Sequence, residues 1–113
     1  MSLIYKILTA DQWRMAQADG VFVGAPVDLA DGYIHFSTAE QVVETAARHF
    51  AGQRGLTLAA VEAEGLAQLK WEPSRGGALF PHLYAPLPLA RVVWARPLPL
   101  GADGRHDFTG VLA

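Results

Sequence analysis

The clearest structural signal in the chain is the stretch from Tyr33 to Phe50, with the sequence YIHFSTAEQVVETAARHF. Its first part, Tyr33 to Ser37, has the alternating pattern of a short strand. The rest has helical spacing, with apolar Val42, Val43, Ala46, Ala47 and Phe50 opposite polar Glu40, Gln41, Glu44, Arg48 and His49. The stretch therefore predicts a strand that leads directly into a helix, with Ser37 and Glu40 as its capping box and Gly52 as its stop.

The same order of strand and helix precedes this stretch. Ser2 to Leu8 is short, apolar and β-prone, which predicts a buried strand. Thr9 and Gln12 have the spacing of a capping box, and the helix that they begin is expected to end at Asp19-Gly20. Residues 20–32 carry four glycine or proline positions and two aspartates, so they predict a loop between the two pairs.

Apolar runs separated by turn residues predict a series of strands after the second helix. These runs are Leu56 to Val61, Leu69 to Glu72, Leu79 to Leu87 and Arg91 to Leu98, with a turn at Pro73 to Gly77. Prolines 81, 86, 88, 97 and 99 confine the last two strands to edges, ends or irregular pairing, because proline has no N–H to donate. We expect a single α+β domain, residues 1–113, whose two helices cover one side of a mostly antiparallel sheet. Trp13, Trp71 and Trp94 are expected in its core.

Composition excludes several classes of function. The chain has 113 residues, the length of one domain, and no cysteine for a disulfide framework, thiol catalysis or a cysteine zinc site. The net charge is -2, and acidic and basic residues are scattered along the chain. This distribution provides no basic surface for non-specific binding of nucleic acid or of anionic membranes. No apolar run has the length of a membrane span and no secretory leader is evident, so we expect a cytoplasmic protein. The hydrophobic fraction of 51% leads us to expect apolar surface that a homodimer would bury.

Three of the expected strands have one apolar face and one face able to do chemistry. Side chains two residues apart share a face of a strand. The polar faces carry His35 with Ser37, Lys70 with Glu72, and His82 with Tyr84. If these strands are neighbours in one sheet, the six side chains line one cleft.

A structural role is also open for each of these residues. A strand histidine such as His35 is often a hydrogen-bonded structural group, and Lys70 with Glu72 has the spacing of a surface ion pair. His82 would cap a sheet edge, and Tyr84 would lie in the core with its hydroxyl satisfied. These roles and the cleft are alternatives that the sequence leaves open.

The segment Ser74 to Gly77 is the other notable feature. Two glycines let backbone N–H groups approach a ligand, and Arg75 suits a phosphate or a carboxylate, so an anion site competes with a plain hairpin loop. The four histidines lack metal-ligand spacing, so no metal site is expected. The chain has no Walker loop, no G-x-G-x-x-G after a strand and no G-x-S-x-G elbow.

Several segments together resemble a known family. They are Ile4 to Ile7 (IYKI), Asp31 to Thr38 (DGYIHFST) with Glu40-Gln41, Lys70 to Glu72 (KWE), and Phe80 to Tyr84 (FPHLY). In this order and over nearly the whole chain, they resemble domain-of-unknown-function family 952, a small bacterial family. That family is grouped with the ADP-ribosyltransferase-like fold. The resemblance implies a compact split sheet that holds NAD, as a substrate, in a central cleft.

The resemblance also implies roles for particular residues. In that superfamily a histidine or arginine of an early strand contacts NAD, a later strand supplies a serine or tyrosine, and a late glutamate assists transfer. His35 resembles the first, Tyr84 or His82 resembles the second, and no glutamate follows Glu72. The expected catalytic residues are His35, Glu72 and His82, and the expected NAD-binding residues are His35, Ser37, Lys70, Arg75 and Tyr84. In these roles His35 contacts the ribose or nicotinamide amide, Ser37 supports it, and Arg75 holds a phosphate. Tyr84 stacks on or flanks the nicotinamide, and Glu72 is the candidate acid–base group.

Three hypotheses for function follow. The first is an NAD-dependent transferase: it moves a glycosyl group from NAD or, without the late glutamate, an RNA 2′-phosphate to NAD. Its partner is RNA or a protein, and Glu72 is a candidate to take the acidic role from a different strand. The second is a non-catalytic module that binds a nucleotide or another small ligand. The third is a structural or interaction protein, such as an obligate dimer.

Overall fold

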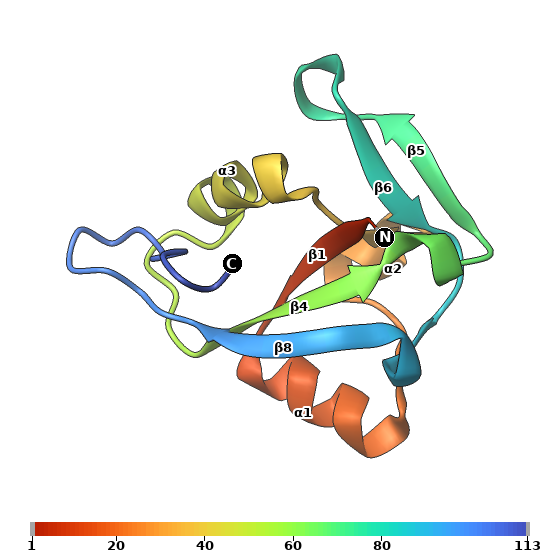
Figure 1. Ribbon diagram of the computed structural model, residues 1–113, viewed down its shortest axis with the longest axis horizontal. Helices are drawn as coiled ribbons and strands as arrows, with labels where there is room; N and C mark the ends of the chain where they lie inside the picture. Colours follow the sequence, from red (N-terminus) through yellow and green to blue (C-terminus); the bar gives the residue numbers. More distant parts are fainter. Residues whose placement is uncertain (1, 113) are drawn as a thin grey trace.

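The central sheet of the molecule has the strand order β1-β4-β8, and every pairing in it is antiparallel (Figure 1). Its strands are β1 (Leu3–Leu8), β4 (Leu56–Glu62) and β8 (Val92–Leu98). The computed structural model describes residues 2–112, and of Arg75 it describes the backbone alone. Because β1 and β8 both pair with β4, the two ends of the chain are joined through the middle of this sheet.

The described residues also form two further antiparallel sheets. One has the order β3-β6-β5 and consists of β3 (Ile34–His35), β6 (Leu79–Leu83) and β5 (Leu69–Pro73); the other pairs β2 (Val21–Phe22) with β7 (Leu87–Pro88). Short 3₁₀ turns lie at Ala63–Gly65, Arg75–Gly77 and Leu89–Arg91. A bridge between Tyr5 and Ser37, with N–H to carbonyl distances of 2.7 and 2.9 Å, connects β1 to the end of β3. The strands expected to carry the candidate site are therefore neighbours in one sheet.

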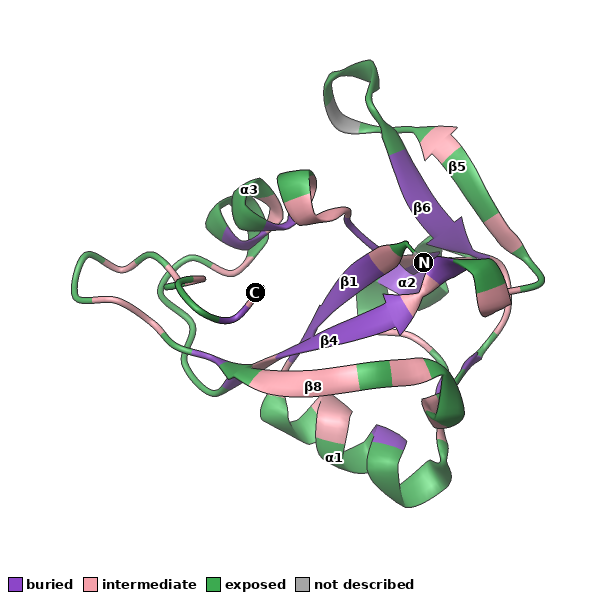
Figure 2. Ribbon diagram, in the orientation of Figure 1, coloured by how far each residue is buried: buried purple, intermediate pink, exposed green. Residues whose placement is uncertain are grey.

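Helices pack on both faces of the central sheet. α1 (Ala10–Asp19) contributes Ala16 to a cluster with Ile4 and Leu8, whereas α3 (Ala39–His49) contributes Val42 to a cluster with Ile7. Residues 4–8 of β1 are all buried, and Figure 2 shows β1 and β4 as the buried centre of the molecule. The expectation that the helices cover one side of the sheet is wrong, because an unbroken run of buried residues needs cover on both faces.

Residues 20–32, predicted as a loop, contain β2 and a third helix, α2 (Pro26–Asp31). Pro26 occupies the first turn, where its missing N–H is not needed, and Gly32 caps the helix C-terminus with φ +88°. The Asp28 carboxylate accepts a hydrogen bond from the N–H of Ala25. The proline, aspartate and glycine that indicated a loop are therefore the residues that begin and end a six-residue helix.

α1 begins and ends as predicted, with reciprocal Thr9 and Gln12 capping bonds and Gly20 at its C-cap. α3 begins one residue later than predicted. Its N-cap is Thr38, whose N–H donates to the Gln41 side chain, so Ser37 and Glu40 are not the capping pair.

The apolar stripe of α3 is narrower than predicted. Val42 and Ala46 are buried, whereas Val43 and Ala47 are exposed. Trp71 is 45% exposed and lies outside the core, while Trp13 and Trp94 pack against the two core clusters.

Pro81 lies within β6, the middle strand of its sheet, and not at an edge as expected. Its carbonyl accepts from the N–H of Phe36, immediately after β3 has ended. In an antiparallel ladder a residue's N–H and C=O point to the same side, so the donor that Pro81 lacks would face a strand that has already stopped. The predicted strand Leu79 to Leu87 also breaks after Leu83, and β7 begins separately at Leu87. Pro97 does lie on an edge strand, β8.

No helix among residues 2–112 is long and apolar enough to cross a membrane.

Candidate functional site

A cavity of about 570 Å³ lies where β1, α2, α3 and the β3-β6-β5 sheet meet. Its wall includes His35, Ser37 and His82, three of the residues predicted for the site. His35 and His82 are register partners on β3 and β6, and their ring centroids lie 5.5 Å apart. The volume is in the range of small-molecule sites, roughly 300–1,000 Å³. Pairing of β3 with β6 thus brings both histidines to one cavity.

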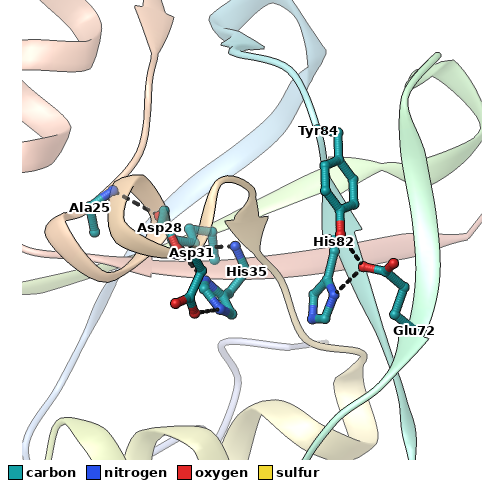
Figure 3. Close-up of polar contacts among 8 residues, drawn as sticks. Ala25, Asp28, Asp31, His35, Glu72, His82 and Tyr84 are labelled. Atoms are coloured by element: carbon teal, nitrogen blue, oxygen red, sulfur yellow. Dashed lines mark hydrogen bonds and ion pairs between the residues drawn. The ribbon is translucent and has the colours of Figure 1, made fainter.

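The first part of the site is a charged network around Asp28. This side chain is 1% exposed and accepts from Lys6 Nζ at 3.1 and 2.9 Å and from the N–H of His35 at 3.1 Å. The Nδ1 atom of His35 lies 2.6 Å from Asp28 Oδ1, and its Nε2 atom lies 2.9 Å from Asp31 Oδ2. Both ring nitrogens of His35 therefore face carboxylates (Figure 3). Through Lys6 and His35, the network fastens α2 to β1 and β3.

The pKa values of this network follow from its burial and pairing. Burial raises the pKa of Asp28, but the hydrogen bond with His35 and the charge of Lys6 outweigh it and lower the pKa to about 2. Burial lowers the pKa of Lys6, and its contacts with Asp28 oppose that shift. Asp28 is therefore a carboxylate at neutral pH, as a buried ion pair requires.

The second part of the site is centred on Glu72 of β5. Its Oε1 atom lies 2.8 Å from His82 Nδ1 and accepts from the Tyr84 hydroxyl at 2.6 Å (Figure 3). These two hydrogen bonds lower the pKa of Glu72. The hydrogen bond between Glu72 and Tyr84 also raises the pKa of Tyr84 to about 12. An ionised carboxylate only accepts, so it fixes the proton of a neutral His82 on Nδ1 and leaves a lone pair on Nε2.

His82 differs from His35 in having a nitrogen available to a ligand. Its side chain is 3% exposed and lines the cavity, and no described residue hydrogen-bonds its Nε2 atom. Nδ1 of His106 is the one buried side-chain nitrogen or oxygen of the described residues without a partner, so Nε2 of His82 keeps some accessible surface. Nε2 of His82 is thus the group on the cavity wall best placed to exchange a proton with a bound molecule.

Tyr33 links the two parts of the site. Its ring stacks on His82 with centroids 4.2 Å apart and lies 4.6 Å from the ring of His35 and 5.1 Å from that of Tyr84. Burial and the nearby carboxylates of Asp31 and Glu72 raise its pKa. The ring holds both histidines in their orientations.

The other predicted site residues have different surroundings. Ser37 is buried, and its hydroxyl contacts that of Thr45 at 3.1 Å on the cavity wall. Lys70 pairs with His82 in the sheet register, and its ammonium lies 5.0 Å from the centre of the Tyr84 ring. Lys70 is not among the described residues that line the cavity. The side chain of Arg75 lies outside the described part of the structure, so its contact with a phosphate stays a prediction.

Sequence reasoning missed Lys6, Asp28, Asp31 and Tyr33. Tyr33 had a usable signal, because the alternation that selected His35 and Ser37 puts Tyr33 on the same strand face. Asp28 and Asp31 were assigned to a loop, and Lys6 pairs with a residue 22 positions away, a separation for which a sequence pattern gives no signal. Within the described residues, no three His, Cys, Asp or Glu side chains are arranged to hold a metal ion.

Comparisons with other proteins identify the family of the chain. Residues 7–95 match the family model described as protein of unknown function (DUF952). A crystal structure of protein CC0527 from Caulobacter crescentus is 54% identical, with a TM-score of 0.95 over 98% of both chains. Its solution NMR structure is 55% identical with a TM-score of 0.89, over 100% of this chain and 98% of that one. No curated protein matches the chain. The match over most of the chain and the likeness of the folds mean that this protein belongs to the DUF952 family.

Proposed function

We propose that the chain is an NAD-binding transferase of the ADP-ribosyltransferase-like kind, with the nucleotide in the cavity between His35 and His82. The observation that carries the proposal is His82, a buried histidine oriented by Glu72 with Nε2 unpaired among the described residues of the cavity wall. The α+β fold with antiparallel sheets agrees with the fold class that the family resemblance implies.

In the proposed reaction His82 acts as a general base. In transfer from NAD, an acceptor hydroxyl or amine bonds to the ribose carbon while the bond from that carbon to the nicotinamide nitrogen breaks. The acceptor loses its proton to Nε2 of His82, and nicotinamide leaves as a neutral ring with the bonding electron pair. Glu72 stabilises the imidazolium that forms, because its carboxylate lies 2.8 Å from Nδ1. In the phosphotransfer variant, a ribose hydroxyl of NAD would lose its proton to the same nitrogen and bond to the phosphorus of the RNA 2′-phosphate. The bond from that phosphorus to the RNA 2′-oxygen would break, and the 2′-oxygen would leave and take up a proton from water.

Titration with NAD followed by amide NMR shifts tests this function. Wild type is compared with His82→Gln, and with His106→Gln as the matched control, because His106 does not line the cavity. We expect NAD to shift the signals of residues 33–37 and 80–84 in wild type and in the control. We further expect nicotinamide release, or 2′-phosphate transfer from RNA, in both of these proteins and its loss in His82→Gln. No shift at millimolar NAD would overturn the proposal.

Binding without turnover is a second candidate, favoured by two observations. No glutamate follows Glu72 in the chain, and both ring nitrogens of His35 already face carboxylates. A protein of this kind would bind NAD in the same cavity with neither nicotinamide release nor phosphate transfer. The activity arm of the experiment above separates the two candidates, since both give the NMR shifts and only the transferase gives products.

A further inference from the structure

We infer that Asp31 is the carboxylate at which the site binds two neighbouring hydroxyls of a ribose. Asp31 is the one acidic residue in the described lining of the cavity. Its side chain is 46% exposed, and its Oδ2 atom lies 2.9 Å from His35 Nε2. The inference rests on the proposed function, because it names the part of the nucleotide that this end of the cavity recognises.

Asp31 has acceptor capacity that no described residue uses. A carboxylate can accept about four hydrogen bonds. Within the described residues the Asp31 carboxylate makes one ion pair, with His35, which leaves Oδ1 and a lone pair of Oδ2 for a ligand. His35 is itself held by Asp28, so Asp31 is positioned by a side chain whose other nitrogen is fixed. A carboxylate held in this way is preorganised to bind.

The other carboxylates near the cavity are less suited to this task. Asp28 is 1% exposed and already accepts from Lys6, Ala25 and His35. Glu72 accepts from His82 and Tyr84 and does not line the cavity. Asp31 is therefore the carboxylate that a molecule in the cavity can reach.

The chemistry of the wall favours hydroxyl groups as its partners. Asp31 offers acceptor oxygens. Nε2 of His82 is a second acceptor, because the contact with Glu72 keeps the proton of the neutral ring on Nδ1. A ligand group that lies next to Asp31 and His82 must therefore supply hydrogen-bond donors. An ammonium group beside Asp31 would also lie beside the ring of His35, which carries positive charge whenever it donates to both carboxylates. Neutral hydroxyls avoid that repulsion, and a vicinal diol places two donors on one carboxylate.

His82 supplies independent support for a ligand in this place. The side chain is 3% exposed and lines the cavity, and its Nε2 atom has no hydrogen-bond partner among the described residues. A ligand anchored at Asp31 would bring a further polar group close to this nitrogen, because the His35 ring that contacts Asp31 lies 5.5 Å from the His82 ring. The two features therefore point to the same occupant.

The test compares a minimal diol with its deoxy analogue. Amide shifts are followed during titration with methyl ribofuranoside, methyl 2-deoxyribofuranoside and NAD. The proteins are wild type, Asp31→Asn, and Asp19→Asn as a control at an exposed acid that does not line the cavity. We expect the 2-deoxy sugar to bind wild type at least about tenfold more weakly than the riboside, since it lacks one charge-assisted hydrogen bond. We expect a loss of about the same size for the riboside with Asp31→Asn and none with Asp19→Asn.

The outcomes separate this inference from the proposed function. If NAD binds and neither Asp31→Asn nor removal of the 2-hydroxyl changes affinity, the inference is overturned and the proposed function stands. If the riboside binds through Asp31 and NAD does not bind, the proposed function is overturned and Asp31 remains the site of the diol. If neither ligand binds wild type, both are overturned. The comparison of the two sugars on wild type keeps the inference testable even if Asp31→Asn fails to fold.

Discussion

Asp28 is the residue on which the local structure around the cavity depends. Its carboxylate is buried and joins α2 to a strand on each side, through Lys6 of β1 and His35 of β3. Removing one member of a buried charged set leaves its partners without compensation, and this cost usually exceeds the net stabilisation that the pair provides.

We predict that Asp28→Asn lowers the free energy of unfolding by about 3–5 kcal/mol, because the buried Lys6 ammonium loses its counter-charge. Urea unfolding followed by circular dichroism measures the change. Asp11→Asn is the matched control: its ion pair with Arg14 is exposed, and its loss is expected to cost less than about 1 kcal/mol. Equal effects of the two substitutions would contradict the role given to Asp28.

The pKa of Asp28 predicts an acid-labile fold. Its pKa falls from the ordinary value of 3.8 to about 2 in the folded protein, so the folded state favours the carboxylate more strongly than the unfolded chain does. The stabilisation is complete above the unfolded value and is lost as the pH falls through the folded value. We expect this residue alone to cost the wild type about 2 kcal/mol between pH 3.8 and about 2. Urea midpoints measured across this range should depend less on pH in Asp28→Asn than in wild type.

The tautomer of His82 is a prediction at the same scale. Because Glu72 accepts at Nδ1, long-range proton–nitrogen NMR spectra should show the neutral form of the His82 ring with its proton on Nδ1 and an unprotonated Nε2. In Glu72→Ala this preference should disappear, whereas Glu40→Ala on the exposed face of α3 should leave it unchanged. A wild-type His82 with its proton on Nε2 would remove the base from the proposed function.

At the scale of elements, α2 depends on its C-terminal glycine. Gly32 has φ +88°, and a Cβ atom there would meet nothing within 4 Å, so a substitution is opposed by the backbone conformation and not by crowding. We predict that Gly32→Ala lowers stability by about 1–2 kcal/mol, and that Gly32→Asn costs less because asparagine tolerates the left-handed region better. Thermal unfolding of the two variants measures the difference. Equal losses would mean that something other than backbone strain limits this position.

Elements with strong local signals could be predicted from the sequence. The Thr9 and Gln12 cap fixes the start of α1, and alternation along three short strands put His35, Glu72 and His82 on faces that the β3-β6-β5 sheet does bring together. α2 was missed because Pro26 and Gly32 are equally common in turns and at helix ends. The missed helix also explains why two of the site residues were missed, since Asp28 and Asp31 reach His35 only because a helix precedes β3.

At the scale of the whole molecule, the core consists of two clusters on opposite faces of one sheet. Ile4 belongs to the cluster under α1 and Ile7 to the cluster under α3, although both residues lie on β1. That division was not predicted, because an apolar run such as LIYKIL does not reveal which helix covers which residue.

We predict that Ile4→Val and Ile7→Val each cost about 0.5–1.5 kcal/mol and that their effects add within about 0.5 kcal/mol in the double variant. The reason is that the two side chains occupy different clusters and share no packing partner. Urea unfolding of the two single variants and the double variant gives the coupling energy. A coupling energy above about 1 kcal/mol would show that the sheet transmits strain between its faces.

The placement of α2 has a practical consequence for finding ligands. Ala25, Pro26 and Asp31 form part of the cavity wall, and the same segment is held in place by the buried Asp28 carboxylate. A compound that fills the cavity therefore contacts a segment that must leave when the chain unfolds, so binding is reported as a higher melting temperature. At a concentration of 100 times its dissociation constant, a ligand adds about 2.7 kcal/mol to stability. A thermal-shift screen of nucleosides, nucleotides and sugars can therefore rank occupants of this cavity without an assay for any reaction.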